Sequence, residues 1–263
     1  MLGVSTWGFA EDEGRRYDEI ATLRAALDAG LTLIDTAELY ARGGAEQLVA
    51  RAIAGRRDET FLVSKVLPEH ATRDGMAAAC AASLRRLGTD RLDLYLLHWR
   101  GRVPLEETIE AFTALVQAGT IRSWGVANFR VADLAELHVA GGNTEACDQV
   151  LYNLAHREIE YDLLPWCVER DIPVLAYLPH EAGRILSDPV LGAVAARHGA
   201  TPAQIAVAWV LRHERMGVVA RADTPAHVHE NCGALDLRLD ARDITELDDA
   251  FPRPLAPRQL VIH

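Results

Sequence analysis

The sequence predicts a single-domain (β/α)8 barrel of the TIM type, and three observations support this fold class. Short apolar or β-branched runs alternate with longer amphipathic stretches along about 250 residues, which is the pattern and length of such barrels. No Gly-x-Gly-x-x-Gly motif follows the first run, where a Rossmann domain would carry it. No Pro-, Gly- or Ser-rich linker divides the chain, so we expect one barrel domain over residues 1–251 and a loosely attached tail over 252–263.

The expected strands are short runs rich in Val, Ile, Leu, Tyr and Phe that are bounded by polar or turn-forming residues. In chain order they span residues 2–7, 31–37, 61–66, 92–98, 121–129, 146–154, 173–179 and 217–223. Their number matches the eight strands of the barrel.

The expected helices lie between these strands and carry apolar residues at helical spacing. They include residues 17–30, 73–88, 105–119, 201–214 and 224–237. Several end in Gly, which helix C-termini prefer. The last begins with Thr224 and Pro225, which suit an N-cap and a first helical turn.

Composition and charge argue against several classes of protein. The 263 residues are 49% hydrophobic and 25% charged, which is typical of a globular protein, and no apolar run approaches the length of about 18 residues that spans a bilayer. The net charge of -11 argues against nucleic-acid partners. Four scattered cysteines and an N-terminus without a leader pattern predict reduced thiols and a cytoplasmic protein. No strand-end His-x-His pair appears, so we expect no metal site.

Four polar residues lie at or just beyond the carboxyl ends of neighbouring expected strands, where (β/α)8 barrels place their active sites. They are Asp35, Tyr40, Lys65 and His98. Lys65 lies within an apolar run, so its ammonium needs a carboxylate partner, and Asp35 on the adjacent strand is available. A nearby ammonium lowers the pKa of a tyrosine, so Tyr40 is expected to act as a general acid, with His98 orienting a carbonyl oxygen. Each of these residues taken singly is also compatible with a purely structural role.

The sequence resembles the aldo-keto reductases from LGVSTWGF to about residue 250. The Asp, Tyr, Lys and His of that family's catalytic tetrad match Asp35 and Tyr40 in IDTAELY, Lys65 in LVSKV and His98 in YLLHW. The resemblance implies a barrel that binds NADPH and reduces a small-molecule carbonyl substrate. Runs such as LTLIDTAE and IEYDLLPWC are most similar to small bacterial members that reduce methylglyoxal and other 2-oxoaldehydes. Members usually begin with a β-hairpin that plugs the barrel, and this sequence starts almost directly in its first strand.

The resemblance also implies cofactor and substrate contacts. Asn128 and Gln149 would bind the nicotinamide carboxamide, Tyr177 would stack on its ring, and the loop from Leu178 to Gly183 would cover the pyrophosphate. Contacts to the adenosine end fall on Arg221, Ala222, His227, Glu230 and Asn231. Arg221 favours NADPH, because its guanidinium suits a 2′-phosphate, while Ala222 and His227 depart from the family's serine and arginine and leave NADH open. Trp7 and Trp99 would line the substrate pocket.

Two other functions fit parts of the pattern. A Schiff-base aldolase would use Lys65 as its nucleophile, but it would leave Asn128, Gln149 and Tyr177 without a purpose. A non-catalytic, cofactor-sensing barrel would bind the nucleotide and reduce nothing. The sequence therefore favours a carbonyl reductase over both.

Overall fold

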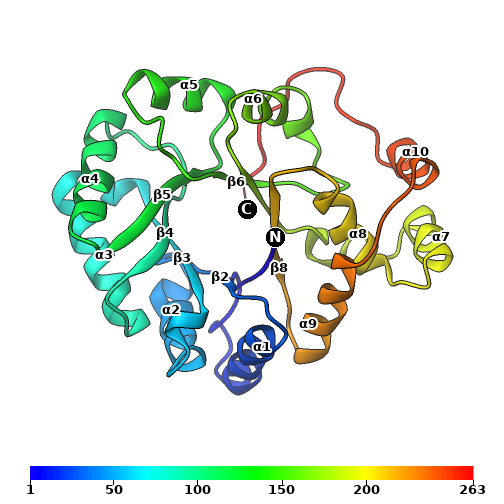
Figure 1. The fold of residues 1–263 in the computed structure, drawn as a ribbon, viewed down its shortest axis with the longest axis horizontal. Coiled ribbons are helices and arrows are strands. Elements are labelled where there is room, and N and C mark those ends of the chain that lie inside the picture. Colours follow the sequence, from blue (N-terminus) through cyan, green and yellow to red (C-terminus); the bar gives the residue numbers. More distant parts are fainter. Residues whose placement is uncertain (263) are drawn as a thin grey trace.

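The computed structural model describes residues 1–262, in which eight parallel strands close into a barrel in chain order (Figure 1). The strands are β1 (Leu2–Ser5), β2 (Leu33–Asp35), β3 (Phe61–Val66), β4 (Leu92–Leu97), β5 (Ile121–Ala127), β6 (Asp148–Leu151), β7 (Val174–Tyr177) and β8 (Met216–Arg221). Each lies within, or within one residue of, a run predicted from the sequence. The predicted fold class is therefore confirmed, although most strands are shorter than the apolar runs that contain them.

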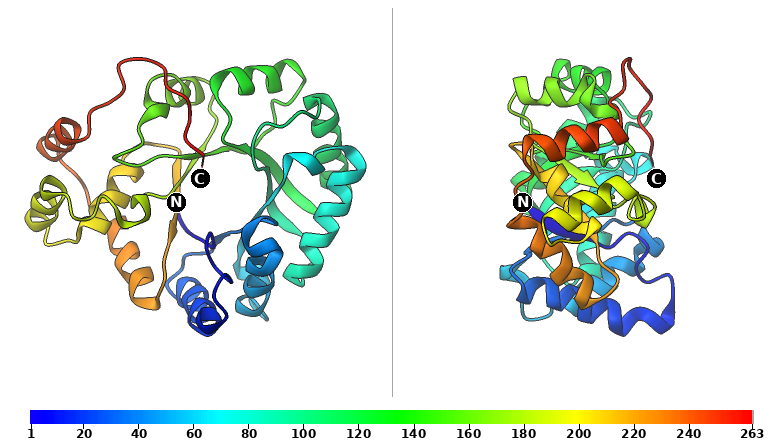
Figure 2. Two further views of the ribbon diagram at one scale, coloured as in Figure 1. Left: turned by 180° about the vertical axis from the view of Figure 1, so that it is seen from behind. Right: turned by 90° about the vertical axis from the view of Figure 1, so that its right-hand side faces the viewer.

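Helices surround the barrel on all sides (Figures 1 and 2). They are α1 (Arg16–Asp28), α2 (Gly44–Ala52), α3 (Arg73–Leu87), α4 (Leu105–Gln117), α5 (Val131–Val139), α6 (Leu163–Glu169), α7 (Pro189–Arg197), α8 (Pro202–Leu211), α9 (Pro225–Cys232) and α10 (Ala241–Ala250). Helix α9 begins as predicted, because the hydroxyl of Thr224 accepts a hydrogen bond from the backbone of His227 at 3.3 Å. Helices α7 and α10 fall outside the simple alternation, and Asp243 of α10 binds both Arg197 and His198 at 2.7 Å.

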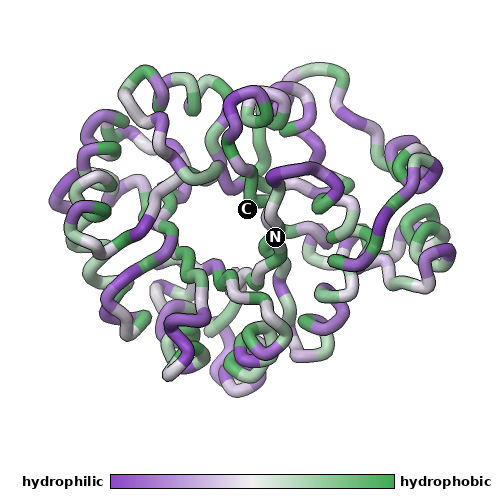
Figure 3. The backbone as a smooth tube through the Cα atoms, viewed as in Figure 1, coloured by the Kyte–Doolittle hydropathy of each residue, from purple (hydrophilic) through white to green (hydrophobic). Residues whose placement is uncertain are grey.

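Two hydrophobic layers hold the barrel together. The larger layer packs the outward side chains of the strands against the helices, as Ile34, Tyr95 and Phe112 illustrate. The smaller layer fills the inside of the barrel with Leu33, Val63, Leu94, Leu96, Cys147, Leu175 and Val219. Hydrophobic stretches accordingly run along the barrel wall, and the surrounding helices alternate between hydrophobic and hydrophilic segments (Figure 3).

The polar residues that point into the barrel lie on the same strand faces as the inner layer. Side chains on a strand alternate between its two faces, so every second residue points inward. The next inward positions after this layer are Asp35, Lys65, His98, Gln149, Tyr177 and Arg221. The sequence therefore places a ring of polar and aromatic groups directly above an apolar floor, at the carboxyl ends of the strands.

A cavity lies near the first residue, at the opposite end of the barrel. Within residues 1–262 no strand precedes β1, as predicted, and a cavity of about 530 Å³ lies beside Met1 and Met216. No helix in the described part of the chain is long and apolar enough to cross a membrane.

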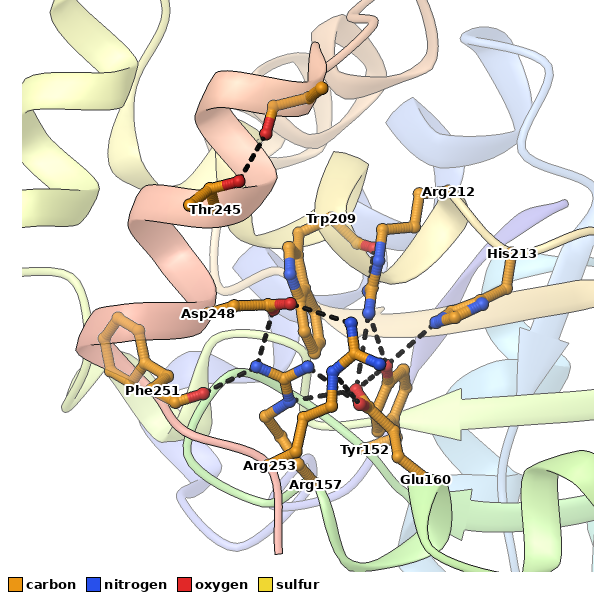
Figure 4. A network of polar contacts seen from close by, with 11 residues as sticks. Tyr152, Arg157, Glu160, Trp209, Arg212, His213, Thr245, Asp248, Phe251 and Arg253 are labelled. Carbon is orange, nitrogen blue, oxygen red and sulfur yellow. Dashed lines mark hydrogen bonds and ion pairs between the residues drawn. The ribbon is translucent and has the colours of Figure 1, made fainter.

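The beginning of the tail is anchored, contrary to the expectation of a loosely attached segment. Arg157 donates a hydrogen bond to the carbonyl of Phe251 at 2.6 Å and pairs with Asp248 at 2.8 Å. Arg253 pairs with the same Asp248 and with Glu160 (Figure 4). From this anchor the tail runs to the face of the barrel opposite the N-terminus, where its end lies near the barrel axis (Figure 2).

Candidate active site

A buried ion pair between Asp35 and Lys65 forms the base of the site. The Lys65 ammonium lies 2.8 Å from both carboxylate oxygens of Asp35, and the two side chains are 0% and 1% exposed. It also donates to the carbonyl of Thr36 at 3.0 Å, and Gln149 donates to Asp35 at 2.8 Å. Burial by itself lowers the pKa of Lys65, but Asp35 and Tyr40 outweigh it, so this pKa is raised above its ordinary value. The predicted pairing is present, and the lysine is held as a cation.

Tyr40 is brought to this ammonium by a tight turn after β2. Ala41 and Arg42 have φ of 48° and 54° and Gly43 has φ of 85°, which reverses the chain before α2. The Lys65 ammonium donates to the Tyr40 hydroxyl at 3.2 Å. Burial raises the pKa of Tyr40 more than Lys65 lowers it, so this pKa is raised and the expected lowering is wrong. Tyr40 therefore keeps its proton at neutral pH, which is the form that a proton donor requires.

His98 contacts the other side of the tyrosine. The two rings meet edge to face with their centroids 5.9 Å apart. Burial, assisted by the charge of Lys65, lowers the pKa of His98 to about 3. Its Nδ1 atom is buried and has no hydrogen-bond partner among the described residues. The imidazole is therefore neutral at physiological pH, so it offers one N–H donor rather than a positive charge.

The amide groups expected to bind nicotinamide lie beside these side chains. Asn128 follows β5 with φ of 61°, donates to the carbonyl of His98 at 3.0 Å and accepts from the Tyr177 hydroxyl at 2.9 Å. A small cavity of about 20 Å³ is lined by Ser5, Trp7, Tyr40, His98, Asn128, Gln149, Tyr177 and Leu178. The catalytic candidates and the nicotinamide candidates therefore converge on one place.

A larger cavity of about 390 Å³ adjoins this one and shares Trp7 and Leu178 with it. Its wall consists of residues 178–180, Ala182, Gly183, Leu186, Ala203, Arg221, Asp223, His227, Glu230, Asn231 and the shared Trp7. Leu178, Glu181 and Ala182 all have positive φ, a geometry that turns successive backbone amides and can form an anion-binding concavity.

His180 lines this cavity and carries a buried polar atom that forms no hydrogen bond with any described residue. Its Nε2 atom is buried without a hydrogen-bond partner in the described structure, and burial lowers its pKa to about 4. An elongated nucleotide suits the two joined cavities, because amide and phenol groups lie at the narrow end and a guanidinium lies at the wide end.

Two residues that were expected to contact the cofactor or the substrate do not line either cavity. Ala222 does not line the large cavity, because its side chain is fully buried in the outer hydrophobic layer. Trp99 lines neither cavity and lies against His98, with ring centroids 4.8 Å apart. Trp7, expected in the substrate pocket, lines both cavities and so lies between the two halves of the site.

Two residues of the wide end were missed by sequence reasoning. Asp223 lies two residues beyond Arg221, and Arg15 reaches it from the loop before α1. The strand-end rule that found the other candidates could have found Asp223. No local sequence signal could have indicated Arg15, because the contact joins residues far apart in the chain.

Comparison with known proteins agrees with this arrangement. The model of the aldo/keto reductase family matches residues 1–188 and 185–251. The chain is 48% identical to methylglyoxal reductase YeaE of Escherichia coli over 259 residues, covering 96% of this chain and 91% of the relative. Two crystal structures of an aldo/keto reductase from Klebsiella pneumoniae are also similar to this chain; one is a complex with NADP and acetate and the other a complex with NADPH. Each shares 47% sequence identity with this chain at a TM-score of 0.97. The matches cover 100% of this chain, and 95% and 94% of the two Klebsiella chains. The chain therefore belongs to the aldo/keto reductase family.

Proposed function

We propose that this protein uses NADPH to reduce 2-oxoaldehydes such as methylglyoxal, and other aldehydes and reactive ketones, to alcohols. Its family makes it a nicotinamide-dependent oxidoreductase, and the proposal concerns its preferred cofactor, its substrate class and the role of each residue. The observation that carries it is the buried Asp35–Lys65–Tyr40 chain of contacts beside the neutral His98. The name of the E. coli relative and the nucleotides in the Klebsiella structures support the choice of substrate and cofactor.

The proposed chemistry divides between cofactor and protein. Bound NADPH supplies a hydride to the carbonyl carbon. Tyr40 donates its phenolic proton to the carbonyl oxygen, and His98 donates a hydrogen bond that orients the same oxygen. Lys65 stabilises the phenolate that remains on Tyr40, because its ammonium already touches the hydroxyl at 3.2 Å. Asp35 keeps Lys65 charged and in position, so it acts through the lysine rather than on the substrate.

Cofactor binding is assigned to the walls of the two cavities. Asn128 and Gln149 offer amide groups to the carboxamide, and Tyr177 offers its ring to the nicotinamide. Arg221 and His227 lie at the end proposed for the 2′-phosphate, with Glu230 and Asn231 nearby for adenine. The turn from Leu178 to Gly183 would cover the pyrophosphate.

The activity is proposed for the cytoplasm. All four cysteines are free thiols, and three of them are buried, which suits a reducing compartment. Burial raises the pKa of Cys80 to about 11, so this thiol stays protonated and unreactive.

Geometry argues against the aldolase alternative. A lysine that forms Schiff bases needs a lowered pKa and a neutral amine. Lys65 instead has a raised pKa and contacts Asp35, Thr36 and Tyr40. Borohydride should therefore trap no substrate adduct on this residue.

The test is a cofactor and substrate panel with the purified protein. Loss of reduced-nicotinamide absorbance is followed with NADPH and with NADH, against methylglyoxal, benzaldehyde, a sugar aldehyde and a simple ketone. We expect consumption of NADPH with the highest kcat/KM for methylglyoxal. Binding of NADPH without turnover of any carbonyl would refute the proposal and favour a cofactor-sensing role.

A further inference from the structure

Asp148 is a buried acidic residue that the proposed chemistry does not use. It is the first residue of β6 and is 0% exposed. Successive residues of a strand point to opposite faces and Gln149 points inward, so Asp148 points outward, into the hydrophobic layer that contains Phe129 and Cys167. Its Oδ1 atom accepts a hydrogen bond from the backbone N–H of Phe129 at 3.4 Å. Its Oδ2 atom is buried and has no hydrogen-bond partner among the described residues.

No positive charge pairs with this carboxyl group. Within residues 1–262 the Phe129 N–H is its one hydrogen-bond partner, and no arginine, lysine or histidine forms an ion pair with it. The titratable groups that interact with it are two acids and two thiols, namely Asp133 of α5, Glu145, Cys147 and Cys167 of α6. The nearby basic groups are engaged elsewhere, because Arg130 pairs with Asp133 at 2.9 Å and His138 pairs with Glu145 at 2.5 Å. An ionised carboxylate here would therefore be buried without compensation.

Burial also changes the acidity of Asp148. The loss of solvation raises the pKa of Asp148 well above its ordinary range, and the hydrogen bond from Phe129 offsets only part of this effect. The neighbouring Asp133 and Glu145 raise this pKa further. Burial raises the pKa of both thiols as well, so they add no charge at neutral pH. Geometry and acidity both favour the protonated, uncharged form of the Asp148 side chain.

The hydrogen bond from Phe129 connects Asp148 to the nicotinamide end of the site. Asn128 precedes Phe129, has φ of 61° and donates its backbone N–H to the carbonyl of Gln149 at 2.8 Å. The dipeptide at the end of β5 is thus joined to the dipeptide at the start of β6 by two hydrogen bonds. Asparagine tolerates a positive φ better than most residues, but the surrounding contacts must hold it there.

We infer that Asp148 is a positioning residue for the nicotinamide: as a neutral carboxylic acid it accepts the Phe129 N–H and thereby holds Asn128 in the turn that presents its amide to the cofactor. The inference rests on the proposed function, which assigns the carboxamide to Asn128 and Gln149. A protonated acid suits this position, because its carbonyl oxygen accepts a hydrogen bond without the cost of a buried charge. Asp148 lines neither cavity, so it acts through the turn.

Infrared spectroscopy tests the protonation of Asp148 directly. The C=O stretch of a protonated carboxylic acid lies at a higher frequency than the bands of carboxylates and amides, and a difference spectrum between the parent protein and Asp148→Asn at neutral pH isolates it. Asp243→Asn is the matched control. Burial alone would raise the pKa of Asp243, but its pairs with Arg197 and His198 at 2.7 Å lower it to about 2. The carboxylic-acid band should be missing in Asp148→Asn and present in Asp243→Asn.

Urea denaturation adds a pH signature. Above the unfolded pKa of about 3.9, the folded parent protein binds a proton at Asp148 that the unfolded chain releases, so this group lowers stability as the pH rises toward the folded pKa. Asp148→Asn removes this effect. Its urea midpoint should therefore move upward relative to the parent's as the pH rises from about 4 to 7. The midpoint of Asp243→Asn should move in the opposite direction, because its parent carboxylate is ionised and paired.

Cofactor binding tests the positioning role. Asp148→Asn keeps an oxygen that accepts from Phe129, so its dissociation constant for NADPH, measured by calorimetry, should stay within about twofold of the parent value. Asp148→Leu has a similar shape but leaves the Phe129 N–H buried and unpaired, so it should weaken NADPH binding about three- to tenfold. Asp243→Asn should bind as the parent does. In the parent protein, saturating NADPH should shift the Asp148 infrared band, because contact with Asn128 alters the hydrogen bond from Phe129.

Other results would overturn the inference. A parent spectrum without the carboxylic-acid band would show that Asp148 is ionised. A band that does not move on NADPH binding, or a folded Asp148→Leu that binds NADPH as tightly as the parent, would show that this carboxyl supports the fold alone. The band shift needs no variant, so it decides the question even where Asp148→Leu does not fold. Failure of the parent protein to bind NADPH would instead refute the proposed function.

Discussion

Replacing Asp35 with Asn tests the buried ion pair that supports Tyr40. The substitution keeps the shape of the side chain and an oxygen for Lys65, but it removes the counter-charge of an ammonium that is 0% exposed. Breaking a buried pair in this way costs about 3–5 kcal/mol, because one charge stays buried without compensation. We therefore expect the free energy of unfolding, measured by urea denaturation at neutral pH, to fall by about this amount.

The pH dependence of the same measurement gives a sharper test. In the parent protein the pKa of Lys65 is raised, so its stabilising contribution is fully present below the unfolded value of about 10.4 and is lost as the pH rises through the folded value. In Asp35→Asn the effect of burial is no longer outweighed, so the folded pKa falls below the unfolded one. The unfolded state then binds more protons than the folded state, and the variant should gain stability as the pH rises toward about 10.

A second substitution separates the charge from the rest of the site. Lys65→Met in the Asp35→Asn background removes the remaining buried charge, so it should restore much of the lost stability and abolish the rising slope. A loss below about 1 kcal/mol in Asp35→Asn, or a slope equal to that of the parent protein, would refute the view that Asp35 keeps Lys65 charged.

Three further predictions follow from the same geometry. Tyr40→Phe should reduce kcat about 10²- to 10⁴-fold with an unchanged dissociation constant for NADPH, since it removes only the proton donor; calorimetry beside the rate assay checks both. Because the pKa of His98 is lowered to about 3, its ring protons should show no titration by NMR between about pH 5 and 8. The stability that the neutral imidazole contributes should be lost as the pH falls from the unfolded pKa of about 6.5 toward the folded pKa of about 3. Arg157→Met should cost about 2–4 kcal/mol and make the chain after Phe251 more sensitive to limited proteolysis, because Glu160 loses its best-buried partner.

The barrel was predictable because its strands have a local signature. Each strand is an apolar or β-branched run that can be recognised in the sequence. In this fold the polar residues of the active site lie at the carboxyl ends of the strands, so their positions follow from the strand assignments. Asp35, Lys65 and His98 could be proposed from that rule alone, before any resemblance was considered. The positions of helices α7 and α10 were harder to predict from the sequence. Asp243 of α10 holds the two helices together by pairing with Arg197 and His198, and this long-range contact leaves no short-range sequence pattern.

The pKa values and ion pairs of these residues were harder to predict from the sequence than their positions in the fold. A tyrosine next to a lysine suggests a lowered pKa, yet the pKa of Tyr40 is raised, because the loss of solvation on burial outweighs the effect of one ammonium. The anchoring of the tail has a similar origin. Arg157 and Arg253 bring Glu160 and Asp248 together from segments far apart in the sequence (Figure 4).

The sequence by itself determined the barrel, the inward positions and the chemical groups that occupy them, because strand alternation and strand-end polarity are local properties of a chain. Only the tertiary structure decided the protonation of Tyr40 and His98 and the pairing of Asp223 with Arg15 and Arg221. Burial and the approach of distant charges set those properties, and neither is encoded in any short stretch of residues.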